Sequence, residues 1–110
     1  MANYQEITSV DEWKKVLEQS SEKPVVVFKH STTCPVSAHA YGEFNSFESP
    51  LARYLVKVIQ HRPVSNEIAS DLGIQHESPQ AFVIANGKAV WNASHWKITK
   101  KELEDVTSSL

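Results

Sequence analysis

The sequence contains few of the residues that mark several large classes of protein. Among its 110 residues there is one cysteine, and there are three glycines. A single cysteine cannot form an internal disulfide, which excludes a small secreted scaffold held together by such bonds. No apolar run approaches the roughly 20 residues that a membrane-spanning helix requires. These absences favour a chain that folds around an ordinary hydrophobic core.

Long basic stretches are also missing. The 11 lysine and arginine residues are outnumbered by 13 aspartate and glutamate residues, so the formal net charge is −2. A surface that follows the phosphates of a nucleic acid therefore has no support. The first residues, "MANYQEITSVDEW", lack the basic and then apolar pattern of a secretion signal. We expect a cytoplasmic protein that binds neither nucleic acid nor membranes.

Length and hydrophobic spacing predict one α/β domain over residues 1–110. A helix over 10–20 is expected to begin at a capping box formed by Ser9 and Glu12, and "PVVVFKH" reads as a strand buried on both faces. The remaining predicted elements are a helix over about 35–48, a strand over 53–61, a helix over 63–73 that Gly73 ends, a hairpin over 80–93 that turns at Asn86-Gly87, and a helix from Thr99 toward Leu110.

The order of these elements predicts the architecture. Strands joined through helices are expected to be parallel neighbours, and the hairpin adds an antiparallel pair. The result is a mixed central sheet of four strands, or five with a short one near residues 4–7, flanked by helices on both faces.

The single cysteine, Cys34, lies in "STTCPVS", at the carboxyl end of the buried strand and the start of the next helix. Chemistry in open α/β sheets collects at this edge, and the free amides of a helix start favour a thiolate over a thiol. Pro35 suits the first helical position. Ser37, one turn into the helix, is expected to donate a hydrogen bond to the thiolate, although serine there also serves as a plain acceptor for backbone amides. Thr33 completes the expected thiolate support.

The spacing of Cys34 and Ser37 selects the kind of reaction. A Cys-x-x-Cys pair attacks a disulfide and then releases the product by closing its own ring, whereas Cys-x-x-Ser can perform only the first step. Cys34 would therefore accept a thiol and wait for an outside thiol to release it. Against this stands the plain alternative that a lone cysteine is a small buried hydrophobic residue.

Other polar residues carry weaker signals. The five histidines show no spacing typical of a metal site, and one cysteine cannot complete the usual zinc ligand sets, so we expect no metal. Lys29, next to the strand end, could support the thiolate electrostatically, but lysine at such a position is usually solvated.

Two stretches carry a resemblance to the thioredoxin superfamily. "VVVFKHSTTCPVS" resembles the active-site segment of glutaredoxins, and in "LGIQHESPQAFVIANGK" the pair Ser78-Pro79 stands where the family has its cis-proline. The resemblance implies a thioredoxin-like fold in which Pro79 is cis and faces Cys34. It also implies that the backbone of Ser78 pairs with the bound thiol substrate.

Within that superfamily the chain is most similar to the monothiol bacilliredoxins of low-GC Gram-positive bacteria, which have a Thr-Cys-Pro-Ile/Val-Ser site. It departs from glutaredoxins at Ser31, where they usually have lysine, and in "NASHWKIT", which lacks their paired glycines. The resemblance implies that Cys34 takes bacillithiol off S-bacillithiolated proteins, with bacillithiol as co-substrate and no tightly bound cofactor. His95 and Trp96 could then form a wall against the sugar or malate part of the adduct, or simply pack in their loop.

Two other functions stay open. A monothiol protein of this fold could hold an iron–sulfur cluster or metal between subunits, although Pro35 replaces the glycine that cluster-binding relatives have. It could also be a stress-linked interaction protein that has kept the fold and lost catalysis.

Overall fold

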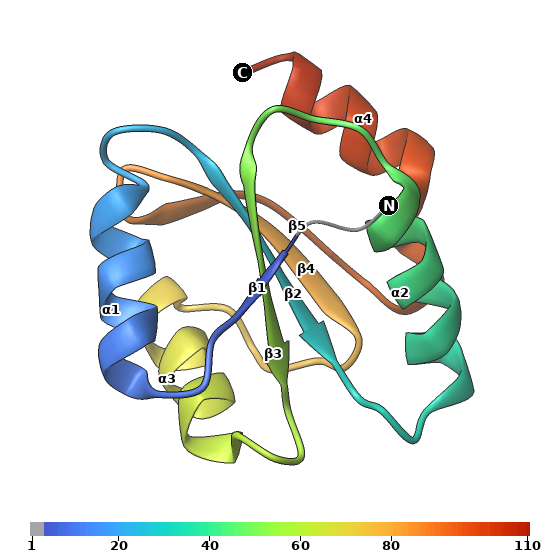
Figure 1. Ribbon diagram of the computed structural model, residues 1–110, viewed down its shortest axis with the longest axis horizontal. Coiled ribbons are helices and arrows are strands. Elements are labelled where there is room, and N and C mark those ends of the chain that lie inside the picture. The colour runs from blue at the N-terminus through green and yellow to red at the C-terminus, as the bar shows by residue number, and fades with distance from the viewer. Residues whose placement is uncertain (1–3) are drawn as a thin grey trace.

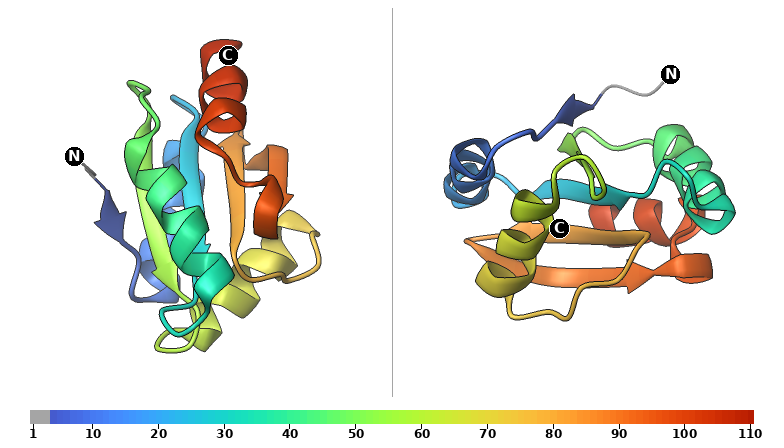
Figure 2. Two further views of the ribbon diagram at one scale, coloured as in Figure 1. Left: turned by 90° about the vertical axis from the view of Figure 1, so that its right-hand side faces the viewer. Right: turned by 90° about the horizontal axis from the view of Figure 1, so that it is seen from below.

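The computed structural model describes residues 4–110 and has an α/β architecture. A five-stranded sheet in the order β1-β3-β2-β4-β5 lies at its centre. The elements in chain order are β1 (Gln5–Glu6), α1 (Val10–Gln19), β2 (Val25–His30), α2 (Pro35–Ser46), β3 (Ala52–Lys57), α3 (Arg62–Leu72), β4 (Gln80–Ala85), β5 (Lys88–Ser94), the 3₁₀ helix η1 (His95–Lys97) and α4 (Lys100–Ser108). Helices α1 and α3 lie on one side of the sheet, and α2 and α4 on the other (Figures 1 and 2).

Local sequence signals set most of the boundaries. Ser9 Oγ accepts the Glu12 N–H at 3.1 Å, as the capping box predicts, and the Glu12 carboxylate accepts from the backbone N–H of Thr8 at 2.7 Å. At the hairpin, Asn86 and Gly87 both have positive φ, as a type I′ turn requires. The β1 strand confirms the fifth, short strand.

Two predicted elements are too long. Strand β3 ends at Lys57 instead of continuing to residue 61, because the chain turns there and the His61 N–H donates to the Lys57 carbonyl at 2.9 Å. Helix α2 ends at Ser46, two residues early, since Phe47 is already extended. In both cases the element ends but the next apolar side chain still packs in the core: Val58, in a turn, and Phe47, in an extended segment, are each buried.

The prediction that strands joined through helices are parallel neighbours holds for β2 and β3. It is wrong for β1 and β2, which have β3 between them, and for β4. Strand β3 already has β1 on one side and β2 on the other, so it offers no free edge. The chain therefore passes through α3 to the free edge of β2, where β4 pairs antiparallel, with Gln80 opposite Lys29. This crossing brings the segment before β4 to the carboxyl end of β2.

The buried strand β2 divides the core. Val25 and Val27 belong to the cluster under α1 and α3, whereas Val26 and Phe28 belong to the cluster under α2 and α4. Because side chains alternate along a strand, the next residue, Lys29, points into the first cluster, and His30 faces α2.

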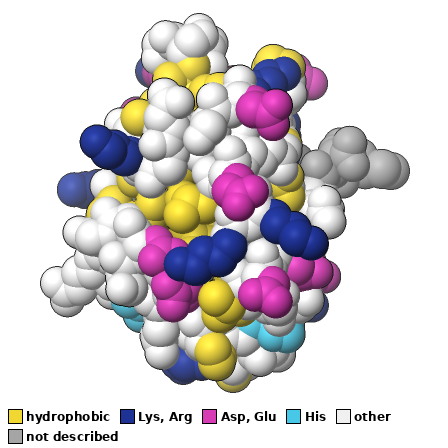
Figure 3. All heavy atoms as spheres, turned by 90° about the vertical axis from the view of Figure 1, so that its left-hand side faces the viewer, with side chains coloured by type: hydrophobic (Ala, Val, Ile, Leu, Met, Phe, Trp, Pro, Cys, Tyr) yellow, Lys and Arg dark blue, Asp and Glu magenta, His cyan; other side chains and the backbone are white. Residues whose placement is uncertain are grey.

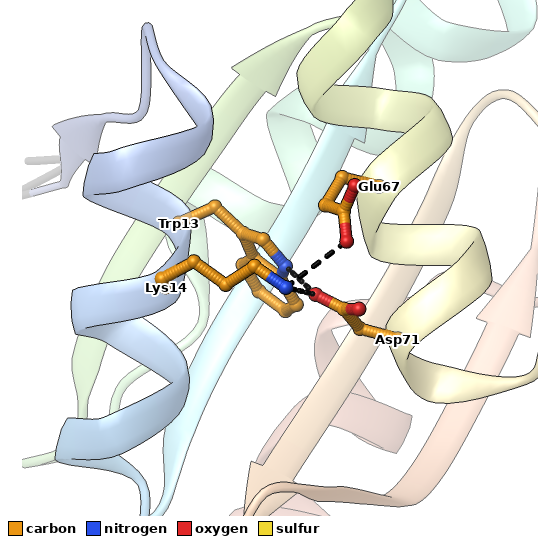
Figure 4. Close-up of polar contacts among 4 residues, drawn as sticks. All are labelled: Trp13, Lys14, Glu67 and Asp71. Carbon is orange, nitrogen blue, oxygen red and sulfur yellow. Dashed lines mark hydrogen bonds and ion pairs between the residues drawn. The ribbon is translucent and has the colours of Figure 1, made fainter.

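A polar cluster joins α1 to α3 over the first core (Figure 4). The buried Trp13 donates its indole N–H to Asp71 Oδ2 at 2.8 Å, and Lys14 Nζ lies 2.8 Å from the same oxygen and 3.0 Å from Glu67. Seen from the α1 side, acidic and basic side chains lie next to each other on this face (Figure 3). Burial raises the pKa of Asp71, but the hydrogen bonds from Lys14 and Trp13 outweigh it and hold that pKa below its ordinary 3.8.

Asp71→Asn is therefore expected to reduce the free energy of unfolding by about 1 kcal/mol at pH 7, the value of a typical hydrogen bond. A carboxylate with a lowered pKa stabilises the fold above its unfolded pKa, so the deficit should shrink as the pH falls below 3.8 and vanish once the pH is also below the lowered pKa of the folded chain. Urea unfolding at pH 7 and pH 3 measures both effects. Glu67→Gln, which removes only an exposed ion pair, is the control and should cost less. A deficit for Asp71→Asn that is unchanged at pH 3 would contradict this account.

Candidate active site

Cys34 occupies the junction that the sequence predicts for it. It is the N-cap residue of α2, four positions after the end of β2, and it is partly exposed. Pro35 opens the helix, and the Ala38 N–H donates to the Cys34 carbonyl at 2.9 Å. Thr33 and Pro35 lie exposed on either side of the cysteine. The sulfur thus sits at the amide-rich end of a helix of 12 residues.

The turn that carries Cys34 is held from below by Ser37. The Cys34 N–H donates to the Ser31 carbonyl at 3.2 Å, and the Ser31 N–H donates to Ser37 Oγ at 2.9 Å. Ser37 is completely buried. Its hydroxyl therefore supports the turn as an acceptor, which is the plain alternative that the sequence offered.

The expected hydrogen bond from Ser37 to the sulfur is not among those of the described residues. Instead, Ser37 Oγ lies 2.8 Å from His30 Nδ1. The His30 ring stacks on Tyr41, with 4.7 Å between centroids, and on Phe28. His30 is therefore a site residue that sequence reasoning missed, because its partner is seven positions away and meets it only when α2 packs on β2.

The loop before β4 has the cis bond that the resemblance implies. The Ser78–Pro79 peptide bond is cis. Because Gln80 pairs with Lys29, Pro79 lies beside the end of β2, from which the Cys34 turn departs. Gln80, itself buried, accepts from the Glu77 N–H and donates to the Gln75 carbonyl, each at 3.2 Å.

Lys29 holds the same loop from inside the core, so the expectation that it is solvated is wrong. It is completely buried, and its ammonium lies 3.0 Å from the Ser65 carbonyl and 3.2 Å from His76 Nδ1. The Lys29 Nζ atom lies over the Phe82 ring, 5.8 Å from the ring centroid. Burial lowers the pKa of Lys29 to about 8. No carboxylate accompanies this charge in the described residues, so the lysine serves to fasten His76 and the cis-proline loop to β2.

A third segment, η1, closes the site between that loop and α2. The His95 N–H donates to the Pro79 carbonyl at 3.1 Å, and His95 Nε2 lies 3.6 Å from Glu77. His95 has φ 56°, a strained value for a residue other than glycine. The next residue, Trp96, is 62% exposed, and its ring packs against the His39 ring of α2 with 5.1 Å between the ring centroids. The predicted wall of His95 and Trp96 therefore borders both the cis-proline loop and the helix of Cys34.

Two further findings concern the described residues 4–110. No three of their histidine, cysteine, aspartate or glutamate side chains form a group that could hold a metal ion. No helix among them is both long and apolar enough to cross a membrane.

Comparisons with known proteins agree with this geometry. A family model described as "Monothiol bacilliredoxin BrxC" matches residues 5–103. A solved structure described as a candidate oxidoreductase with a thioredoxin fold is 40% identical, with a TM-score of 0.85 over 93% of this chain and 91% of that one. Thioredoxins of Fasciola hepatica (15% identity, TM-score 0.77, 96% and 97% covered) and Malassezia sympodialis (20%, 0.77, 99% and 91%) share the fold. The thioredoxin-like fold class is thereby confirmed.

The buried Lys29 predicts a distinctive dependence of stability on pH. Its pKa is about 8 in the folded chain, below the ordinary 10.5, so between these pH values the unfolded chain binds more protons. The wild type should therefore gain stability relative to Lys29→Met as the pH rises from 8 to 10.5, by about 3 kcal/mol. Chemical denaturation across this range measures the gain, and Lys88→Met, at an exposed lysine, is the control. A difference that stays constant over this range would show that the lysine carries no such penalty.

Proposed function

The chain belongs to the monothiol bacilliredoxin family, and we propose that it removes bacillithiol from S-bacillithiolated proteins by thiol exchange at Cys34. The observation that carries the proposal is the position of this one cysteine. It is partly exposed at the N-cap of α2, in the turn that leaves the same end of β2 beside which the cis-proline loop lies, with no second cysteine in the chain. Thiol redox chemistry as such follows from the family and the fold.

The reaction consists of two exchanges. The Cys34 thiolate attacks the bacillithiol sulfur of the client's mixed disulfide, so the bond between client and bacillithiol breaks and a Cys34–bacillithiol disulfide forms. The client leaves as a thiolate and takes a proton from water. An outside thiol then attacks the bacillithiol sulfur, leaves with the bacillithiol as a new mixed disulfide and regenerates Cys34. Bacillithiol is thus a co-substrate, and no tightly bound cofactor takes part.

The surrounding residues divide the work. The first amides of α2 stabilise the thiolate, and Pro35 fixes the entry to the helix. In the proposal, the backbone of Ser78 pairs with the bound disulfide, Pro79 keeps that backbone in position, and Thr33 borders the entering group. His95 and Trp96 form the surface against which the sugar and malate parts of bacillithiol rest, since an exposed indole offers an apolar face with a polar edge.

Two alternatives differ in a simple readout. A cluster-holding adaptor would be coloured when freshly purified, whereas the proposed reductase is colourless. An interaction protein without catalysis would have an unreactive Cys34. Two observations count against these alternatives. Pro35 at the first position of α2 replaces the glycine of cluster-binding relatives, and the partial exposure of Cys34 leaves it accessible to react.

Intact-mass spectrometry tests the proposal. Reduced protein is exposed briefly to a bacillithiolated client and, in parallel, to the same client carrying glutathione. We expect a bacillithiol-sized adduct on Cys34 that forms at least about tenfold faster than the glutathione adduct, a difference of about 1.4 kcal/mol in the barrier. Cys34→Ser is the control and should gain no adduct. No adduct from either client would refute thiol transfer, and equal rates would refute the choice of bacillithiol.

A further inference from the structure

We infer that His30 is a positioning residue for Cys34, acting through Ser37, and that protonation of its ring changes the reactivity of the cysteine. The inference rests on Cys34 being the reacting group of the proposed function, and it assigns a second residue to that site.

Three hydrogen bonds connect the ring to the cysteine. His30 Nδ1 lies 2.8 Å from Ser37 Oγ, the Ser31 N–H donates to the same oxygen at 2.9 Å, and the Ser31 carbonyl accepts from the Cys34 N–H at 3.2 Å. Ser37 is the third residue of α2 and Cys34 is its N-cap. A side chain at this helical position reaches back toward the cap residue, so the hydroxyl is oriented toward the cysteine's end of the helix.

The ring cannot easily leave this arrangement. It stacks on Tyr41 and on Phe28, with 16° and 24° between the ring planes. The Tyr41 hydroxyl is itself fixed by a 2.8 Å hydrogen bond to the Tyr4 hydroxyl. A change in the charge of His30 therefore acts through the direction of its hydrogen bond, while the ring stays in position.

That direction decides what the Ser37 proton can do. We take the neutral ring to carry its proton on Nε2, so that Nδ1 accepts from the Ser37 hydroxyl, which then cannot donate elsewhere. Once Nδ1 carries a proton, the ring becomes the donor. Ser37 Oγ then accepts two hydrogen bonds, from His30 and from Ser31, and its own proton is free. In the inferred state this proton turns toward a thiolate on Cys34, the N-cap of the same helix, so protonation of His30 favours the reactive form of the cysteine.

The groups around His30 set the pH at which this happens. Burial lowers the pKa of His30 below its ordinary 6.5, and the charge of Lys57, its neighbour on β3, lowers it further. Lys57 is partly neutralised by Glu6 of β1 at 3.3 Å. From α2 the titratable group that stacks on the ring is Tyr41. Tyr4, whose pKa is raised to about 12 by its hydrogen bond to Tyr41, stays neutral. The hydrogen bond between His30 and Ser37 should therefore reverse its direction at mildly acidic pH.

The test measures alkylation of Cys34 by iodoacetamide from pH 5 to pH 9, while NMR gives the pH at which the His30 ring titrates. The variants are His30→Gln, Ser37→Ala and the double variant. Below the His30 titration, the wild type should react about threefold faster than either single variant, the effect of one modest hydrogen bond. Above it the difference should shrink. The double variant should be no slower than the single ones, because each substitution already removes the hydrogen bond between His30 and Ser37.

His61→Gln is the matched control, since the His61 side chain makes no hydrogen bond at the cap of α3. It should follow the wild type at every pH. Equal rates for all proteins, effects of the two variants that multiply, or the same loss in His61→Gln would each overturn the inference. If His30→Gln does not fold, Ser37→Ala decides alone, because it leaves the ring untouched. The probe is not bacillithiol, so this outcome is independent of whether bacillithiol is the substrate.

Discussion

The last two residues of β2 determine the geometry of the site. Because side chains alternate along a strand, Lys29 enters the core under α3 and His30 faces α2. Lys29 fastens the loop that carries the cis-proline, and His30 meets the serine that supports the turn of Cys34. The end of β2 therefore positions both the cis-proline loop and the turn of Cys34. Strand β2 is itself the central, buried strand of the sheet.

The thiol chemistry follows from the position of Cys34 and from the absence of a second cysteine. A thiol at a helix start, next to a cis-proline loop, is suited to attack a disulfide. With serine at position 37 and no other cysteine, the chain has no group to release the product by itself. The buried hydroxyl does different work, supporting the turn and contacting His30. The serine that makes the site monothiol therefore also has a structural role, because its hydroxyl supports the turn that carries Cys34.

Local features of this structure could be predicted from the sequence, whereas features that depend on distant contacts could not. The caps at Ser9 and Thr99, the Asn86-Gly87 turn and the position of Cys34 need only neighbouring residues. The cis bond at Pro79 followed from the resemblance. The antiparallel β4 depended on which strand edge was free, and the burial of Lys29 depended on contacts with α3 and His76, more than 30 positions away. For Ser37, both roles could be predicted from the sequence, but the choice between them depended on the contact with His30.

The most direct measurement is the crystal structure of the protein with bacillithiol attached to Cys34. Such a disulfide can be prepared from the wild type, because no second cysteine resolves it once free thiols are removed. We expect the adduct to lie along Ser78 and Pro79, with its thiol part paired to the Ser78 backbone and its sugar against Trp96. An adduct that points away from this loop into solvent would contradict the central claim that the end of β2 assembles these segments into one binding site.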